Sequence, residues 1–144
     1  MKKYILLILN SIISNFVFQV FLYSQVSINS LDSPYTQNFD ALSNTGTANP
    51  WTDNSTIAGW YANLTTYRAD DGNSNVGAMY SYGTAASTER ALGGLTSNTI
   101  PTVRQGVRIV NNTGSTIGVL QISYTGEQWR RNIFAQRLSF EYQI

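Results

Sequence analysis

The chain has 144 residues, a formal net charge of +1, and neither histidine nor cysteine. These absences exclude Ser-His-Asp triads, cysteine nucleophiles, disulfides, and zinc, haem or iron–sulfur sites built on His or Cys. Its two lysines, Lys2 and Lys3, both lie at the start, so the rest of the chain holds neither a Schiff-base lysine nor a P-loop.

The first 24 residues have the pattern of a secretory signal peptide. Lys2 and Lys3 precede an apolar run that ends near the small residue Ser24. The alternative is a retained membrane anchor, since about 20 apolar residues span a bilayer. Five polar residues interrupt the run, namely Asn10, Ser11, Ser14, Asn15 and Gln19. They favour cleavage, so we expect a secreted or cell-surface protein that contacts a membrane only if the leader is not cleaved.

Residues 25–144 have the composition of a single extracellular β domain. They hold seven arginines against eight acidic residues, which is not the basic balance of a nucleic-acid binder. Asn, Ser, Thr and Gly are abundant, but 13 aromatic residues are spread among them. Aromatic and β-branched residues with many turn formers favour strands over disorder.

The first half of this domain contains several short strand patterns. Residues 35–42 predict a strand that turns Tyr35 and Phe39 inward, and residues 43–55 predict a surface loop. Residues 59–69 and 76–83 predict strands on either side of a turn, the sequence DDGNSN at residues 70–75. Residues 91–103 predict a short strand, a Gly-Gly break and a turn marked by Pro101.

The second half contains the clearest patterns. Residues 106–112 and 116–126 flank the turn-rich NNTGST and predict a β-hairpin. Residues 137–144 alternate strictly, with Leu138, Phe140, Tyr142 and Ile144 on one face. With no helical periodicity, the chain predicts an all-β fold, an antiparallel β-sandwich of jelly-roll type over residues 25–144. The chain stops inside its best strand, so we expect this sandwich to be incomplete, the N-terminal part of a longer protein.

The sequence TGEQWRRN at residues 125–132 is the most chemically loaded segment. Glu127 beside Trp129 suggests a carboxylic acid next to a sugar-stacking ring, but a glycosidase needs a second carboxylate nearby. We favour pairing of Glu127 with an arginine (Arg90, Arg130 or Arg131) over ligand binding, and ligand binding over catalysis. No catalytic residue is assigned. The candidate ligand-binding residues are Trp51, Glu127, Trp129 and Arg130, with Trp51 expected to be exposed and Trp60 and Trp129 expected in the core.

The turn at residues 70–75 suggests a calcium site. Asp71, Asn73 and Asn75 have the spacing that begins an EF-hand loop, but Val76 and Tyr82 occupy positions that need Gly and Glu. An ordinary turn is favoured, because Asp, Asn and Gly tolerate left-handed backbone angles. We therefore expect no cofactor, with structural calcium as the alternative.

The sequence also resembles a recurring bacterial extracellular β domain. The resemblance lies in STERALG (residues 87–93), NNTGST (111–116) and YTGEQWR (124–130), in this order. Such domains lie near the N-terminus of secreted multidomain proteins, many with C-terminal sorting or anchoring signals and some with nuclease or lamin-tail modules. The resemblance implies no catalytic residues.

We therefore expect an exported, non-catalytic β-sandwich module for surface adhesion or polymer binding. Carbohydrate, as a polysaccharide or cell-surface polymer, is the expected ligand. The alternative is an accessory N-terminal module of an extracellular hydrolase or nuclease whose catalytic domain lies outside this chain.

Overall fold

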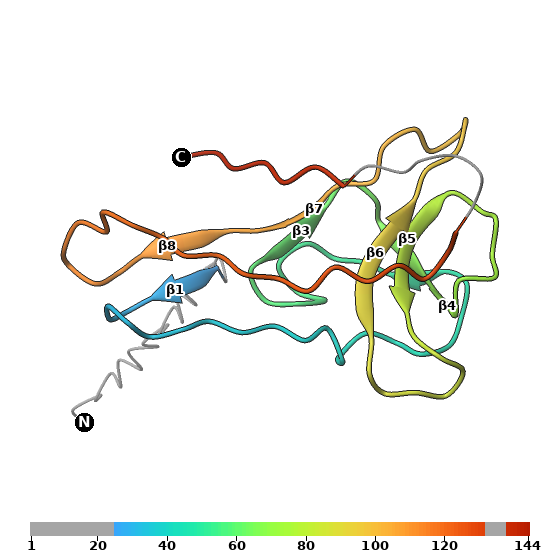
Figure 1. Cartoon of the computed structure of the whole chain (residues 1–144), viewed down its shortest axis with the longest axis horizontal. Coiled ribbons are helices and arrows are strands. Elements are labelled where there is room, and N and C mark those ends of the chain that lie inside the picture. The colour runs from blue at the N-terminus through green and yellow to red at the C-terminus, as the bar shows by residue number, and fades with distance from the viewer. Residues whose placement is uncertain (1–24, 132–137) are drawn as a thin grey trace, which may run out of the picture.

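The computed structural model describes residues 25–131 and 138–144, which are all-β, as predicted. The expected signal peptide, residues 1–24, lies outside the described residues. Eight short strands make up the regular structure, and no helix occurs in the described part of the chain (Figure 1). They are β1 (Val26–Ile28), β2 (Asn49–Pro50), β3 (Trp60–Ala62), β4 (Thr66–Asp70), β5 (Ala78–Tyr82), β6 (Ala91–Leu95), β7 (Gln105–Val107) and β8 (Ile109–Asn111).

The largest sheet has four strands in the order β2-β4-β5-β6. Strands β4 and β5 are parallel, with Tyr67 opposite Met79 and Asp70 opposite Tyr82, while β2–β4 and β5–β6 are antiparallel. Two further pairs complete the strand set: β1–β8 is parallel and β3–β7 is antiparallel. The four-stranded sheet is therefore mixed and the β1–β8 pair is parallel, which differs from the expected antiparallel arrangement. The sandwich and jelly-roll assignment remains a prediction.

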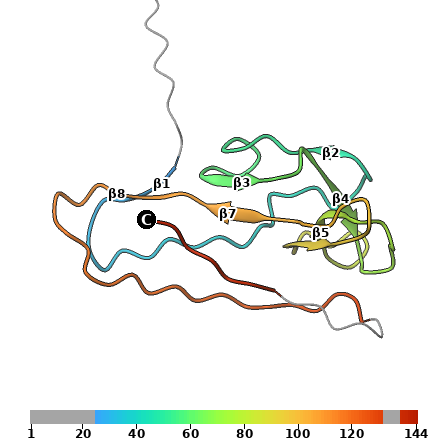
Figure 2. The same cartoon turned by 90° about the horizontal axis from the view of Figure 1, so that it is seen from above.

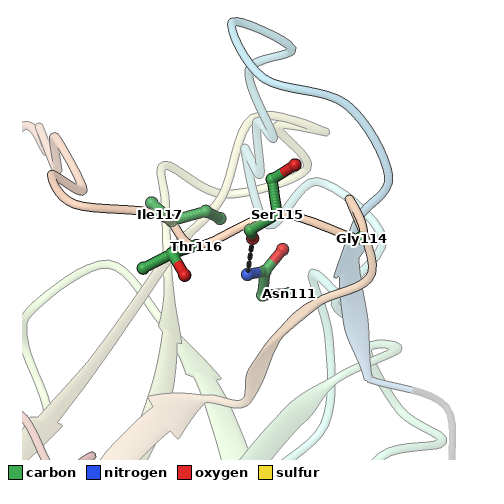
Figure 3. A pocket seen from close by; sticks show the side chains of 5 residues that line it. All are labelled: Asn111, Gly114, Ser115, Thr116 and Ile117. Atoms are coloured by element: carbon green, nitrogen blue, oxygen red, sulfur yellow. Dashed lines mark hydrogen bonds between the residues drawn. The ribbon is translucent and has the colours of Figure 1, made fainter.

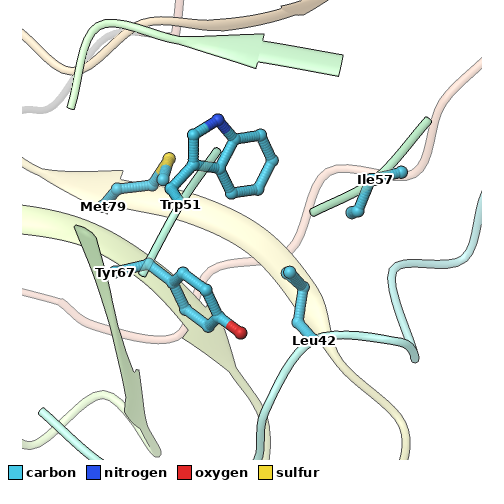
Figure 4. Packing of buried hydrophobic residues seen from close by; sticks show 5 residues of the cluster. All are labelled: Leu42, Trp51, Ile57, Tyr67 and Met79. Atoms are coloured by element: carbon cyan, nitrogen blue, oxygen red, sulfur yellow. The ribbon is translucent and has the colours of Figure 1, made fainter. Parts of the chain in front are cut away.

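The hydrophobic core lies on the β4–β5 pair and contains Trp51, so the prediction that Trp51 is exposed is wrong. Figure 4 shows the core cluster, which consists of Leu42, Trp51, Ile57, Tyr67 and Met79. Trp51 was expected to be exposed, but it is only 4 % exposed and its ring meets that of Tyr67 edge-on. Its backbone N–H bonds to the Thr65 carbonyl, and its indole N–H donates to Asp53 at 2.9 Å. Because the polar edge of the ring has a partner, the apolar body can be buried at little cost.

The predicted N-terminal strand at residues 35–42 does not form; the segment is irregular and ends in a turn at residues 40–41. Phe39 has a left-handed φ of 64°, and its carbonyl accepts the N–H of Leu42. Phe39 still packs inward, edge-on against the half-buried Trp60 at 4.8 Å, but Tyr35 is 44 % exposed. The side chain of Gln37 bonds the Phe39 N–H, and such local bonds offer the backbone an alternative to a strand.

The predicted hairpin around NNTGST does not form. The first of its two runs splits into β7 and β8, and β8 pairs with β1 from the other end of the chain. The second run, residues 116–126, is not a strand in the structure, and neither are residues 138–144. Arg137, the first residue of the predicted C-terminal strand, lies outside the described residues.

These two segments form what we term the C-terminal apolar face, residues 119–124 and 138–144. Its large apolar side chains are between 49 % and 112 % exposed, and the rings of Tyr124 and Phe140 stack at 6.1 Å. Figure 2 shows residues 116–126 running along the outside of the molecule, apart from the labelled strands. An isolated strand has no ladder to join, so alternating sequence alone does not make these segments strands.

Candidate functional site

Three aromatic rings form a stack on one face of the four-stranded sheet. Tyr80 and Tyr82 are two residues apart on β5, so their side chains share a face, and their rings stack at 4.8 Å. Trp129 stacks on Tyr82 at 6.2 Å with an interplanar angle of 5°. Tyr82 also lies against Gly93 of β6, where a Cβ would come within 3.0 Å of its ring. The stack therefore connects a strand of the sheet to residues 125–131 of the segment TGEQWRRN, whose last residue, Asn132, lies outside the described residues.

Glu127 fixes the edge of Trp129. Its carboxylate accepts the indole N–H at 2.7 Å, and Glu127 itself is exposed. The predicted pairing of Glu127 with an arginine is therefore wrong for the described residues. Trp129 is half-buried rather than enclosed in the core, so the two residues lie together at the surface as a ring with a carboxylate at its edge.

Arg130 is held by the oxygens of the loop 70–75. One guanidinium nitrogen donates to three consecutive carbonyls, those of Gly72 (3.3 Å), Asn73 (3.1 Å) and Ser74 (2.8 Å). The other donates to the side-chain oxygen of Asn75. Two of the three residues predicted to bind calcium therefore give their oxygens to a guanidinium, since Asn73 contributes its carbonyl and Asn75 its amide.

The third predicted calcium ligand, Asp71, accepts the N–H of Asn73 at 3.3 Å within the loop. Its neighbour Asp70 accepts the N–H groups of Gly72 and Ser74 at 2.8 and 3.0 Å, which shapes the turn. No group of three or more His, Cys, Asp or Glu side chains suited to a metal ion occurs within residues 25–131 and 138–144. In this structure the loop oxygens accept the hydrogen bonds that the Arg130 guanidinium donates.

Gly72 allows the segment to approach this closely. It has a left-handed φ of 94°, and a Cβ at this position would overlap the carbonyl oxygen of Trp129. Only glycine combines this backbone conformation with room for a second chain segment. Trp129, Arg130 and Gly72 therefore join the segment TGEQWRRN to the β4–β5 connection.

A pocket of about 230 Å³ adjoins this loop, and Arg90 contributes to its wall. The other lining residues are Asn44, Ala69, Asp70, Asp71, Gly83 and Ala85. Arg90 is only 2 % exposed, and its guanidinium donates to the Ser81 hydroxyl at 2.8 Å, to the Ser81 carbonyl and to the Thr84 carbonyl at 3.4 Å. Its backbone N–H donates to Asp40 at 3.0 Å. Sequence reasoning considered Arg90 only as a partner for Glu127 and missed this buried role.

Burial shifts the pKa values of two ionisable groups around the site, Tyr82 and Arg90. It raises the pKa of the Tyr82 phenol above its ordinary value; Tyr80 and Asp70 add to the rise, and Arg130 opposes it. Burial lowers the pKa of the Arg90 guanidinium, while Glu89 opposes that shift. Both shifts arise mainly from desolvation, so they indicate packing rather than a pair of groups prepared for proton transfer.

A second, more open pocket of about 520 Å³ lies on the loop after β8 (Figure 3). Its lining residues are Asn111, Gly114, Ser115, Thr116 and Ile117. The Asn111 amide donates to the Ser115 carbonyl at 2.7 Å, so this polar group serves the turn itself. The pocket has no charged lining residue and carries no candidate for chemistry.

Among the four candidate ligand residues, the structure brings together Glu127, Trp129 and Arg130 and places Trp51 in the core. Across the described residues, no helix is long and apolar enough to cross a membrane. Comparison with protein-family models, with curated proteins and with solved structures found no match to this chain.

Proposed function

We propose that this protein is an exported, non-catalytic β module that binds a carbohydrate polymer at the cell surface or outside the cell, through Trp129. The single observation that carries the proposal is the fixed ring of Trp129, backed by Tyr82 on one side and held at its edge by Glu127. A planar ring in a defined orientation suits the flat face of a sugar, because little side-chain freedom remains to be lost on binding.

Polar groups around the ring supply the second requirement of a sugar site. Glu127 lies at its edge, and the loop 70–75 beside it carries Asp71, Asn73 and Asn75. Carboxylates and amides are the hydrogen-bonding groups that sugar hydroxyls use. We propose that Arg130 stabilises this surface, because its guanidinium donates hydrogen bonds to the loop oxygens. We propose that no cofactor is required, since this guanidinium supplies the positive charge that a calcium ion would otherwise bring to these oxygens.

Affinity electrophoresis tests this function directly. The purified protein is run through gels containing soluble β-glucan, xylan, mannan or a chitin derivative, and we expect retardation by at least one of them. Trp129→Ala should weaken the affinity at least about tenfold, which corresponds to about 1.4 kcal/mol. Tyr35→Ala is the matched control, because Tyr35 is an exposed aromatic residue outside this site. No retardation by any polymer, or equal loss in both variants, would overturn the proposal.

A further inference from the structure

The C-terminal apolar face, residues 119–124 and 138–144, plays no part in the proposed site. Leu120, Ile122 and Tyr124 are 51 %, 49 % and 66 % exposed, although their two-residue spacing is that of a buried strand face. Phe140 and Tyr142 are 58 % and 80 % exposed on the adjoining segment. Contiguous exposed apolar surface of this kind marks an interaction surface in soluble proteins.

The backbone of this face is also unpaired within the described part of the chain. None of residues 116–126 or 138–144 forms a hydrogen bond with another described residue. An extended segment with free N–H and C=O groups is a template for strand addition. The occupant therefore has to supply both a strand backbone and apolar side chains, which a polysaccharide does not.

Charge selects among polypeptide partners. No charged residue occurs between Arg108 and Glu127, and Glu141 is the one charged residue of residues 138–144, so residues 119–124 themselves have no charge with which to attract a charged partner. The same absence removes like-charge repulsion when the stretch meets its own copy. In an antiparallel pairing centred on Ile122, Leu120 of each copy would lie opposite Tyr124 of the other, and the two Ile122 side chains would meet near the two-fold axis, as an isologous interface requires.

The exposed aromatic area amounts to about half of the area that each partner of a stable dimer buries. Aromatic side chains present about 150–250 Å² each, so Tyr124, Phe140 and Tyr142 together expose on the order of 400 Å². Each partner in a standard interface buries about 800 Å². The aromatic residues alone approach half of that area, and the exposed Leu, Ile and Val side chains of the face extend it.

We infer that two copies of this chain associate through the C-terminal apolar face, with residues 119–124 of each copy pairing in antiparallel fashion with those of the other. The proposal is independent of the carbohydrate site, since Trp129 and Glu127 are not part of the pairing segment. The dimer places two carbohydrate sites on one particle, which would add avidity for a polymer.

Analytical ultracentrifugation of the purified protein tests the dimer. We expect twice the chain mass at micromolar concentration, and we expect Ile122→Asp to weaken dimerisation at least about 100-fold, because it places a carboxylate in an apolar contact. Val76→Asp is the matched control, since Val76 is 50 % exposed on another part of the molecule. A monomeric wild-type protein, a dimeric Ile122→Asp variant or an equally weakened Val76→Asp variant would overturn the proposal.

Cross-linking tests the dimer without relying on the folding of the Ile122→Asp variant. The chain has no cysteine, so a single introduced cysteine would be the only thiol that can react with a cross-linker. Ser123→Cys should give a covalent dimer with a short bis-maleimide, whereas the exposed Ser33→Cys should not. Equal cross-linking of the two variants, or a ladder of higher oligomers from Ser123→Cys, would contradict a closed two-fold pairing.

Discussion

At the scale of single residues, two arginines of the described chain have guanidinium groups that donate to neutral oxygens rather than to carboxylates. Arg90 is buried against Ser81 and Thr84, and Arg130 lies against the carbonyls of the loop 70–75. A guanidinium has five donors in a planar fork, so neutral oxygens can satisfy it when several of them converge. Each arginine thereby joins parts of the chain that are distant in sequence.

Replacing Arg130 tests the role of the second arginine. Arg130→Gln should lower the free energy of unfolding by about 1–2 kcal/mol, because charge-assisted hydrogen bonds to the loop are lost at a partly exposed site. Hydrogen exchange at the Gly72 and Ser74 amides should accelerate as the loop loosens.

The neighbouring Arg131→Gln serves as the control, since Arg131 is exposed. We expect its stability and exchange to match those of the wild-type protein. Adding calcium or EDTA should leave the melting temperature of the wild-type protein unchanged. A calcium-dependent increase would show that the loop binds the ion and that Arg130 is not its main partner.

At the scale of elements, the loop between β4 and β5 and the segment TGEQWRRN form one unit. The loop contributes carbonyls and a glycine without a Cβ, while the segment contributes a ring and a guanidinium. Close approach of two backbones depends on Gly72, whereas the exposed Gly114 has a similar φ of 74° with nothing near its Cβ position. Substituting each of these two glycines therefore separates the effect of backbone strain, which both positions share, from the effect of steric crowding, which only Gly72 has.

The variants Gly72→Ala and Gly114→Ala test this contact by urea denaturation. Both force alanine into a left-handed conformation, which costs on the order of 1 kcal/mol. Gly72→Ala should cost at least about 1 kcal/mol more, because the methyl group displaces the Trp129 carbonyl and strains the aromatic stack. If the two variants lose the same stability, the segment is not packed on this loop in solution.

At the scale of the whole molecule, burial of the Tyr82 phenol makes the free energy of unfolding depend on pH in the alkaline range. The pKa of Tyr82 is raised in the folded protein, while an unfolded tyrosine has a pKa of about 10. The neutral phenol is present in both states below pH 10, so the contribution of Tyr82 is constant there. Above pH 10 the unfolded state ionises first, and stability falls as the pH rises.

Tyr82→Phe should reduce this alkaline loss of stability. Its ring keeps the stack with Tyr80 and Trp129, while the ionisable group is removed. Urea denaturation at pH 8 and at pH 11 gives the comparison, and the variant should lose less stability between the two than the wild-type protein. An identical loss would contradict a raised pKa of Tyr82 in the folded protein.

The sequence predicted the strand regions of the middle of the chain well and the ends poorly. Residues 76–83 contain β5 as expected, because its aromatic residues lie between clear turns. The single strand predicted over residues 59–69 is instead divided into β3 and β4, which belong to different sheets, and β4 ends at Asp70. Residues 116–126 and 138–144 alternate as clearly but lack a partner in the described structure. Alternation records which side chains can share a face, whereas a strand also needs a neighbouring backbone.

The sequence by itself determined the all-β class and excluded the chemistry of histidine and cysteine, because composition and periodicity are local properties. It also identified the segment TGEQWRRN and the loop 70–75 as unusual. Only the tertiary structure decided that the two are partners, that Trp51 is buried and that Glu127 holds a ring rather than an arginine. The bonds of Arg130 to the loop join residues more than 50 positions apart, and the place of Trp51 depends on burial, while Glu127 holds the nearby ring of Trp129 because Arg130 is engaged by the loop. Neither spacing nor residue type specifies which distant surfaces meet.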